Sequence, residues 1–499
     1  MKAANPGQDE EATAALMLQN RRMELHVVIT GDKDLSGQLY RQLRDAIGDG
    51  RLPADEQLPP SRLLAAQLQV SRKTVSEVYA RLTFEKLLVG RVGIGTFVAP
   101  QVAPRARHAP ARPLASHAAV EKWRALELPL RHPPVAGKAR YEFIGGSPAI
   151  ELFPHADWRR CTLHALRENA RTRALYGPAE GHPELREAIA RHVGFARGVR
   201  CTPHDVIVTN GAQQALALLA RVLAEPGATA VVEDPGYPQA RLILEANGAR
   251  VVGVPVDAEG IVVDAIPSDA RLVYVTPSHQ FPLGLPMSEP RRRALLARAH
   301  EIGAIVVEDD YDSEFRYTGR PTDSLQGMDD TGNVALVGSF SKTVSPSLRL
   351  GYVIAPPAVA EAVANVKHLV DWHTPTQTQA ALAKFMADGD LQRHIRRCHA
   401  AYAQRRERLV ARFVDDLAPW FELVPTTAGF HMTALARRAL DMATLLNLAR
   451  RVDVGLYPLA PFYRSTPVRD GLLLGFGMIA AEDIDPALDR VRAVLEQMG

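Results

Sequence analysis

The stretch that decides the fold of most of this chain is Gly338-Ser339-Phe340-Ser341-Lys342-Thr343-Val344-Ser345-Pro346-Ser347-Leu348-Arg349-Leu350-Gly351-Tyr352. It places Lys342 among small hydroxyl side chains, with Arg349 a short way behind it. An earlier apolar run, Ala304 to Val307, ends in the acidic sequence Glu308-Asp309-Asp310-Tyr311-Asp312. An amine, an arginine with hydroxyls, and a carboxylate at a strand end are the groups that pyridoxal phosphate (PLP) requires.

Length and composition describe a globular protein of more than one domain. The chain has 499 residues, of which 46% are hydrophobic and 23% charged, so two or three domains with sizeable cores are expected. No apolar run reaches the roughly 18 residues of a membrane span, and residues 1–20 lack a secretory signal. Three widely spaced cysteines predict free thiols and a cytoplasmic protein. Nothing predicts a metal site.

Residues 35–98 carry the pattern of a winged helix-turn-helix. Apolar residues recur at helical spacing from Leu35, and Gly48 ends that helix. Ser61 is expected to cap a second helix and Ser71 a third. Two short strands around a glycine-rich turn follow at residues 87–98. A helix that begins with hydroxyls and cations suits the major groove of DNA.

This stretch closely resembles the GntR-type winged-helix domain. The resemblance covers residues 35–99 and is carried by residues 58–65, 70–75 and 93–96, and residues 25–100 are expected to form the DNA-binding domain. It implies that the third helix and the wing contact an operator in double-stranded DNA. The expected DNA-binding residues are Arg62, Ser71, Arg72, Lys73, Thr74, Arg91, Gly95 and Thr96.

Two segments flank the DNA-binding domain without a clear apolar period. Residues 1–24 are polar and alanine-rich and predict a mobile tail. Residues 101–140 are proline-rich and contain eight Lys/Arg against two Glu, which predicts a semi-extended basic linker. This linker either adds nonspecific attraction to phosphates or is a soluble tether, and the sequence leaves both open.

Residues 141–499 alternate helical stretches with short β-branched runs, which indicates an α/β domain with a mainly parallel sheet. Ligands bind beyond the carboxyl ends of such strands, and the candidate residues follow the runs. Gly211, Ala212 and Gln213 open a helix that offers N–H groups to a phosphate. Tyr237 and His279 each follow another run. Tyr237 is equally consistent with a surface turn, and a lone loop histidine is more often solvated.

Together these residues resemble the fold type I PLP enzymes of the aspartate aminotransferase group, which also have a smaller C-terminal α+β subdomain. The resemblance makes Lys342 the lysine that forms the Schiff base. It pairs Asp309 with the ring nitrogen, with Asp310 as the alternate, and places Tyr311 at the ring hydroxyl and Tyr237 on the ring. It assigns the phosphate to Ser339, Arg349, the turn 211–213 and Tyr176 of a neighbouring subunit. A homodimer is therefore implied, and a domain-swapped head-to-tail arrangement stays open.

Two departures from the enzyme pattern leave cofactor binding intact but argue against efficient transamination. Phe281 stands where these enzymes carry an asparagine that supports the ring hydroxyl, and Leu473 stands where many carry an arginine that binds a carboxylate. Arg464 is the candidate substitute for that arginine. The order of winged helix, basic linker and aminotransferase-like domain resembles the MocR/GabR family of transcription regulators.

We therefore expect a PLP-dependent, DNA-binding transcriptional regulator. It would sense a small amine or amino acid, or PLP itself, through an aldimine at Lys342. The alternative is an active aminotransferase with an accessory DNA-binding domain, and residual transamination half-reactions are compatible with either. A third interpretation, a DNA-binding protein with a PLP-free dimerisation scaffold, fits the lysine–aspartate–arginine set less well.

Overall fold

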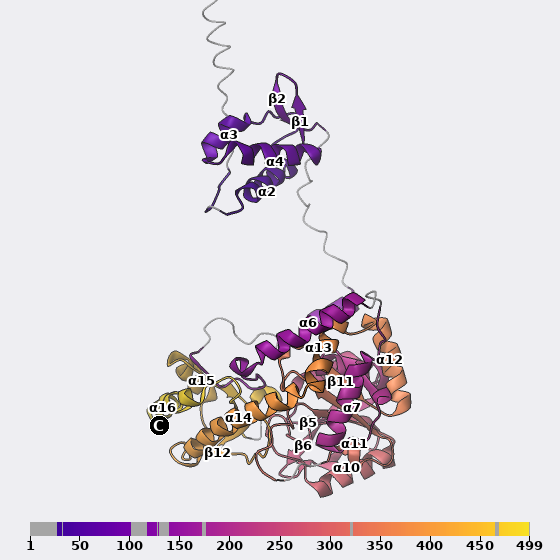
Figure 1. Ribbon diagram of the computed structural model, residues 1–499. Helices are drawn as coiled ribbons and strands as arrows, with labels where there is room; N and C mark the ends of the chain where they lie inside the picture. The colour runs from indigo at the N-terminus through magenta and orange to yellow at the C-terminus, as the bar shows by residue number, and fades with distance from the viewer. Residues whose placement is uncertain are drawn as a thin grey trace, which may run out of the picture. The chain divides into compact units, whose positions relative to one another are not determined.

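A computed structural model describes residues 27–31, 33–100, 117–126, 128, 139–171, 176–319, 323–464 and 469–498. The chain divides into two compact units, Met1–Glu127 and Leu128–Gly499 (Figure 1). The predicted tail, residues 1–24, lies outside the described residues, as does most of the predicted linker. Within that linker the described part includes one helix, α5 (Ala118–Arg124).

The N-terminal unit is a winged helix-turn-helix, as predicted (Figure 1). Three helices, α2 (Leu35–Gly48), α3 (Ser61–Leu68) and α4 (Arg72–Phe84), precede an antiparallel hairpin of β1 (Leu88–Arg91) and β2 (Gly95–Val98). Buried residues from all five of these elements form one core, which includes Leu39, Leu64, Val75, Leu88 and Val98. Each helix therefore buries one apolar face, and the opposite faces stay exposed.

The caps of α3 and α4 differ from each other. The Ser71 hydroxyl accepts a hydrogen bond from the Thr74 backbone N–H at 3.0 Å and caps α4, as predicted. The prediction that Ser61 caps α3 is wrong. Pro60 occupies the cap position with φ −52° and ψ 140°, so Ser61 is already the first helical residue. Proline fits there because the extended residue before a helix needs no N–H donor.

The larger unit is built on an eight-stranded sheet with the order β4-β11-β10-β9-β8-β5-β6-β7. Neighbouring strands from β10 to β6 run parallel, whereas β11 and β7 run antiparallel to their neighbours. The strands are β4 (Val206–Thr209), β5 (Thr229–Asp234), β6 (Arg250–Asp257), β7 (Gly260–Ile261), β8 (Ala270–Val275), β9 (Ile305–Asp310), β10 (Val334–Ser339) and β11 (Gly351–Ile354).

Helices cover both faces of this sheet. Alternate residues point to opposite faces, so Val206 and Val208 pack in one core with α6, α7 and α13, while Ile207 packs with α8, α9 and α12 in another. A third core lies under α10. The helices are α6 (His155–Arg171), α7 (Pro183–Arg197), α8 (Ala212–Leu223), α9 (Pro238–Ala246), α10 (Glu289–Ile302), α11 (Leu325–Met328), α12 (Pro357–Asp371) and α13 (Thr376–Ala387).

A smaller subdomain is formed mostly by the chain after α14 (Asp390–Val414), as the fold type I resemblance implied. Its antiparallel sheet has the order β12-β13-β16-β15, and a separate two-stranded parallel sheet joins β14 to β3. Its elements are β3 (Tyr141–Glu142), β12 (Phe421–Leu423), β13 (His431–Ala436), α15 (Met442–Arg451), β14 (Val454–Gly455), β15 (Tyr457–Pro458), β16 (Gly471–Gly475) and α16 (Ala481–Met498). Among the described helices none is both long and apolar enough to cross a membrane.

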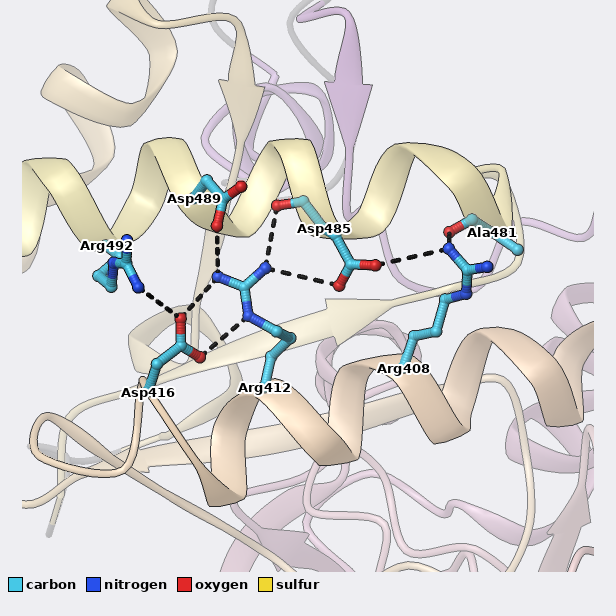
Figure 2. Close-up of polar contacts among 7 residues, drawn as sticks. All are labelled: Arg408, Arg412, Asp416, Ala481, Asp485, Asp489 and Arg492. Carbon is cyan, nitrogen blue, oxygen red and sulfur yellow. Dashed lines mark hydrogen bonds and ion pairs between the residues drawn. The ribbon is translucent and has the colours of Figure 1, made fainter.

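An ion-pair network joins α14 to α16 (Figure 2). Arg412 lies at its centre and contacts Asp416 at 2.7 Å, Asp489 at 2.8 Å and Asp485 at 3.5 Å. Asp416, and after it Asp489, raise the pKa of Arg412, and Arg412 lowers the pKa of Asp416. Because the Arg412 side chain is mostly buried, the network is screened less than a surface pair and fixes how the two helices pack.

Candidate cofactor site and DNA-binding surface

One cavity of about 690 Å³ lies where the strands of the central sheet end. The fold rule for parallel sheets predicts a ligand there. Eight of the residues predicted from sequence line it: Ala212, Gln213, Tyr237, Asp309, Tyr311, Ser339, Lys342 and Arg349. Four others do not line it: Gly211, His279, Tyr176 and Arg464.

Lys342 follows β10 and carries its amine into this cavity. The amine donates a hydrogen bond to the Gly146 carbonyl, from the segment that precedes α6. Burial lowers the pKa of Lys342, while Asp312 and Asp309 oppose that shift. A lowered pKa keeps more of the amine unprotonated, which is the form that attacks a carbonyl carbon.

Asp309 and Asp310 end β9 and point to opposite sides of the sheet. Asp309 lines the cavity. Its Oδ2 accepts a hydrogen bond from the Tyr274 hydroxyl at 2.7 Å, and its buried Oδ1 has no hydrogen-bond partner among the described residues. Asp310 instead pairs with Arg197 at 3.0 Å and lines a separate cavity. The free oxygen of Asp309 is thus the buried acceptor available to a protonated ring nitrogen.

Aromatic side chains form the walls beside Asp309. The Tyr311 hydroxyl donates to the His279 carbonyl at 2.7 Å, and Tyr237 packs edge-on against Phe281 at 5.7 Å between ring centroids. Tyr237 is half-buried at the start of α9 and is not a surface tyrosine. Tyr274, which the sequence analysis missed, holds Asp309 in place from β8. Its position between two valines gave no polar signal.

The anion-binding end of the cavity combines a helix N-terminus with an arginine. Ala212 and Gln213 begin α8, whose first N–H groups lack intrahelical partners. Arg349 has a left-handed backbone (φ 51°), and its Nη2 donates to the Asn210 carbonyl at 3.1 Å. Gly211 has φ +79°, a backbone conformation that side-chain-bearing residues rarely adopt, so the turn favours glycine there. This geometry suits a phosphate.

His279 lies behind the cavity wall rather than in it. Its Nδ1 is 3.0 Å from Asp312, its Nε2 is 3.2 Å from the Thr426 hydroxyl, and its ring is 4.3 Å from that of His431. Burial lowers the pKa of both histidines to about 3. The donor atoms of His279, Asp312 and His431 lie within 4.8 Å of one another, a spacing that a metal ion would also accept. Asp312 and His431, both missed from sequence, line the cavity.

One part of the cavity lining is apolar. Leu473 is buried in β16 and lines it with Phe281 and Phe462. Among the described lining residues, Arg349 is the only arginine and Lys342 the only lysine. Arg464 is exposed and donates to the carbonyl of Val251, so the structure does not bring the predicted substitute for the carboxylate-binding arginine to the cavity.

Tyr176 belongs to an exposed aromatic cluster on the same unit. Its side chain is 76% exposed, and its ring lies 4.4 Å from that of Trp372. Leu369, near the end of α12, is 84% exposed. Large apolar side chains exposed together on one part of a protein often mark a contact surface.

The predicted DNA-binding residues lie on the exposed side of the N-terminal unit. Arg62, Arg72 and Lys73 are exposed, and Lys73 is 3.9 Å from Glu77. Arg91, at the wing, pairs with Asp55 and stacks over the Phe97 ring at 4.4 Å. The remaining predicted residues are Ser71 and Thr74, whose hydroxyls hydrogen-bond each other, and Gly95 and Thr96 in the hairpin.

Comparison with known proteins matches both units. Residues 153–469 match the aminotransferase class I and II family, and residues 35–98 match the gntR family of bacterial regulatory proteins. The chain is 37% identical to the probable rhizopine catabolism regulatory protein MocR of Rhizobium meliloti, over 93% of this chain and 94% of that protein. It is 33% identical to the pyridoxine biosynthesis transcriptional regulator PdxR of Corynebacterium glutamicum, over 88% and 91%.

The fold of the larger unit is similar to that of solved aminotransferase structures. An archaeal alanine:glyoxylate aminotransferase superposes with a TM-score of 0.68 at 26% identity and covers 77% of this chain and 94% of its own. The kynurenine aminotransferase of Pyrococcus horikoshii gives a TM-score of 0.67 at 25% identity, with 77% and 95% covered.

Fold and site thus define a winged-helix DNA-binding unit joined to an aminotransferase-like unit that uses PLP. The lysine, the unpartnered oxygen of Asp309 and the anion-binding turn fit that cofactor. The chain belongs to the aminotransferase class I and II family and, with its GntR-type domain, to the MocR-type transcriptional regulators. It is a PLP-dependent, DNA-binding transcriptional regulator.

Proposed function

We propose that the chain senses a small amine or amino acid, or PLP itself, at Lys342 and changes its affinity for operator DNA in response. The observation that carries this proposal is one cavity that holds the Lys342 amine and the unpartnered Asp309 Oδ1, with one part of its lining apolar. Because such a regulator acts on the chromosome, we place it in the cytoplasm.

Different residues would bind different parts of the cofactor. Asp309 would bind the protonated ring nitrogen, and Arg349, Ser339 and the start of α8 would bind the phosphate. Tyr237 and Tyr311 would enclose the ring. When bound, PLP supplies an electron-withdrawing ring whose aldehyde carbon combines with amines. Lys342 would supply the protein's amine and yield its place to an effector amine.

The part of the cavity that would bind the effector offers no arginine to a carboxylate among its described residues, so it favours effectors that have no carboxylate. Leu473 is buried and apolar there, and the single lining arginine is assigned to the phosphate. The PdxR relative is named for pyridoxine biosynthesis, which supports the variant in which PLP is itself the effector. An effector shifts DNA affinity only as far as it prefers one of two states, commonly by about 1–3 kcal/mol.

We infer that the working form is a homodimer. Tyr176, Trp372 and Leu369 offer an exposed apolar surface. By the resemblance to fold type I enzymes, Tyr176 would reach the phosphate bound by the partner subunit. A dimer also presents two winged helices, which matches the paired half-sites that such domains bind.

Two measurements test the proposal. Lys342→Ala should remove the near-visible absorption of the PLP-loaded protein, whereas Lys384→Ala, at an ion pair with Asp388, should leave it unchanged. Operator binding should differ with and without PLP in the native protein and stop responding in Lys342→Ala. Unaltered absorption in Lys342→Ala would refute the site. Equal operator affinity in every state would refute sensing.

An active aminotransferase is the second candidate, because the residues that would hold PLP resemble those of enzymes. Turnover with a panel of amino donors and 2-oxo acids separates the two. Slow or single turnover with operator protection supports the regulator. Fast multiple turnover without operator protection supports the enzyme.

A further inference from the structure

A polar network ties the anion-binding turn to the end of α12. Asp371, the last residue of α12, accepts hydrogen bonds at its Oδ2 from Asn210 Nδ2 at 2.8 Å and from Gln214 Nε2 at 2.6 Å. Its Oδ1 accepts from Lys367 Nζ at 2.7 Å. Gln214 also accepts from the Asn210 backbone N–H at 2.8 Å. One carboxylate therefore collects three side-chain donors.

The burial of Lys367 shows that this network has a defined structure. Its side chain is fully buried, and the Asp371 side chain is 20% exposed. Burial lowers the pKa of Lys367, and Asp371 opposes that shift. A buried ammonium is costly unless it is paired, so the two residues hold each other in one geometry.

The donors on Asp371 bracket the turn that would meet the phosphate. Asn210 and Gln214 stand on either side of residues 211–213, and the Asn210 carbonyl also receives Arg349. We propose that Asp371 is a positioning residue for the phosphate end of the cavity, although it does not line that cavity. This inference rests on the proposed assignment of the phosphate to Arg349 and the start of α8.

The same residue connects the turn to the exposed aromatic cluster. Trp372 follows Asp371 with a positive φ (60°), and its ring contacts that of Tyr176 at 4.4 Å between centroids. A phosphate that orders the turn through Asn210 and Gln214 thereby also orders the end of α12. Because such coupling is reciprocal, dimer formation should tighten cofactor binding by the factor with which the cofactor tightens the dimer.

The test compares PLP with pyridoxal, which has the same aldehyde and ring but no phosphate. Each is titrated into the cofactor-free full-length chain by absorbance. Asp371→Asn leaves one acceptor oxygen for three donors and should weaken PLP binding about tenfold, equivalent to about 1.4 kcal/mol. Its pyridoxal affinity should change less than about twofold. Asn210→Ala, which keeps the Lys367–Asp371 pair, should act in the same direction.

Asp388→Asn is the matched control, because Asp388 also lies at the C-terminal end of a helix and pairs with a lysine four residues before it. It should change neither affinity. Sedimentation with and without PLP should show a weaker PLP effect on the dimer in Asp371→Asn than in the native chain.

Each outcome has one meaning. If the native chain binds PLP no better than pyridoxal, the phosphate assignment itself fails. If the native chain prefers PLP and both Asp371→Asn and Asn210→Ala keep that preference, only the positioning role fails. Equal losses for PLP and pyridoxal would also overturn it, because they indicate general disruption.

Discussion

At the scale of single residues, Asp309 sets the chemistry of the cofactor cavity. Burial raises its pKa to about 7, although the hydrogen bond from Tyr274 favours the ionised form. The carboxyl is therefore neutral in acid and charged in base. Only the charged form pairs with a protonated ring nitrogen.

This titration predicts that PLP affinity of the cofactor-free chain rises as pH increases through about 7. Asp309→Asn should lower the affinity and flatten this part of the pH profile, because the amide carries no charge at any pH. Dissociation constants measured from pH 5.5 to 8.5 (roughly the range around the Asp309 pKa) test this. An equally steep profile in Asp309→Asn would assign the titration to another group.

Buried carboxyls also predict how stability depends on pH. Burial raises the pKa values of Glu233, Asp309 and Asp312 to about 7, above their ordinary values near 4. Between those pH values the unfolded chain has lost protons that the folded chain retains, so the free energy of unfolding falls as pH rises from about 4 to about 7. Above about 7 these groups add no further slope.

Glu233→Gln should therefore weaken this dependence, since it removes one of the three titrations. Denaturant unfolding of the cofactor-free chain at pH 5 and pH 8 (about 2 units on one side and 1 on the other of the Glu233 pKa) measures it. The variant should be relatively more stable at the higher pH. No change in the difference between the two pH values would contradict the role of Glu233.

At the scale of elements, the start of α4 is held by one side chain. Ser71→Ala should lower the local stability of α4 by about 1 kcal/mol, because the Thr74 N–H loses its acceptor. Hydrogen exchange of the α4 amides measures this. Ser61→Ala is the control, since Ser61 makes no cap bond in α3, and should shift α3 by less than about 0.5 kcal/mol.

The packing of α14 against α16 gives a second prediction. Arg412→Met removes the centre of the network and leaves three carboxylates near one another (Figure 2). We expect the free energy of unfolding to fall by about 2 kcal/mol. Arg293→Met, at an exposed pair with Glu289, should cost less than about 1 kcal/mol. Equal losses would mean that burial adds nothing to the network.

Local patterns predicted the parallel strands but missed antiparallel ones. The β-branched runs at residues 272–275, 305–307 and 334–337 form parallel strands, because buried parallel strands are continuous apolar runs. No local pattern predicted β11, which pairs with β4 and β10, although it begins within the stretch 338–352 around Lys342. Its pairing depends on residues far away in the chain.

The residues of the cavity were also only partly predictable from local sequence patterns. Lys342, Asp309 and Arg349 stand out in sequence because each follows a strand or a turn, and all three line the cavity. Asp312, His431 and Tyr274 gave no comparable signal, since His431 and Tyr274 lie within strands and all three act through contacts with residues far away in the sequence. Arg464 was proposed from type alone and lies elsewhere.

At the scale of the whole molecule, the exposed aromatic cluster predicts self-association. Leu369→Glu places a charge on that surface and should shift the chain toward monomers by at least about tenfold in dimer dissociation constant. Operator affinity should fall with it, because two half-sites are no longer bound together. Analytical ultracentrifugation and operator titration measure the two effects.

Phe195→Glu is the control for this change. Phe195 is also highly exposed, at 97%, but belongs to α7 and not to the aromatic cluster. It should leave the dimer unchanged. A monomer in both variants would show that charge in general, and not this surface, decides assembly.

The two consecutive aspartates of β9 carry an evolutionary consequence. Asp309 and Asp310 point into different cavities because successive residues of a strand alternate sides. Deletion or insertion of one residue within β9 would exchange their environments. It would also turn the apolar side chains of the strand to the opposite face of the sheet. Descendants of this gene can therefore vary the composition of β9, but we expect its length to stay constant among them.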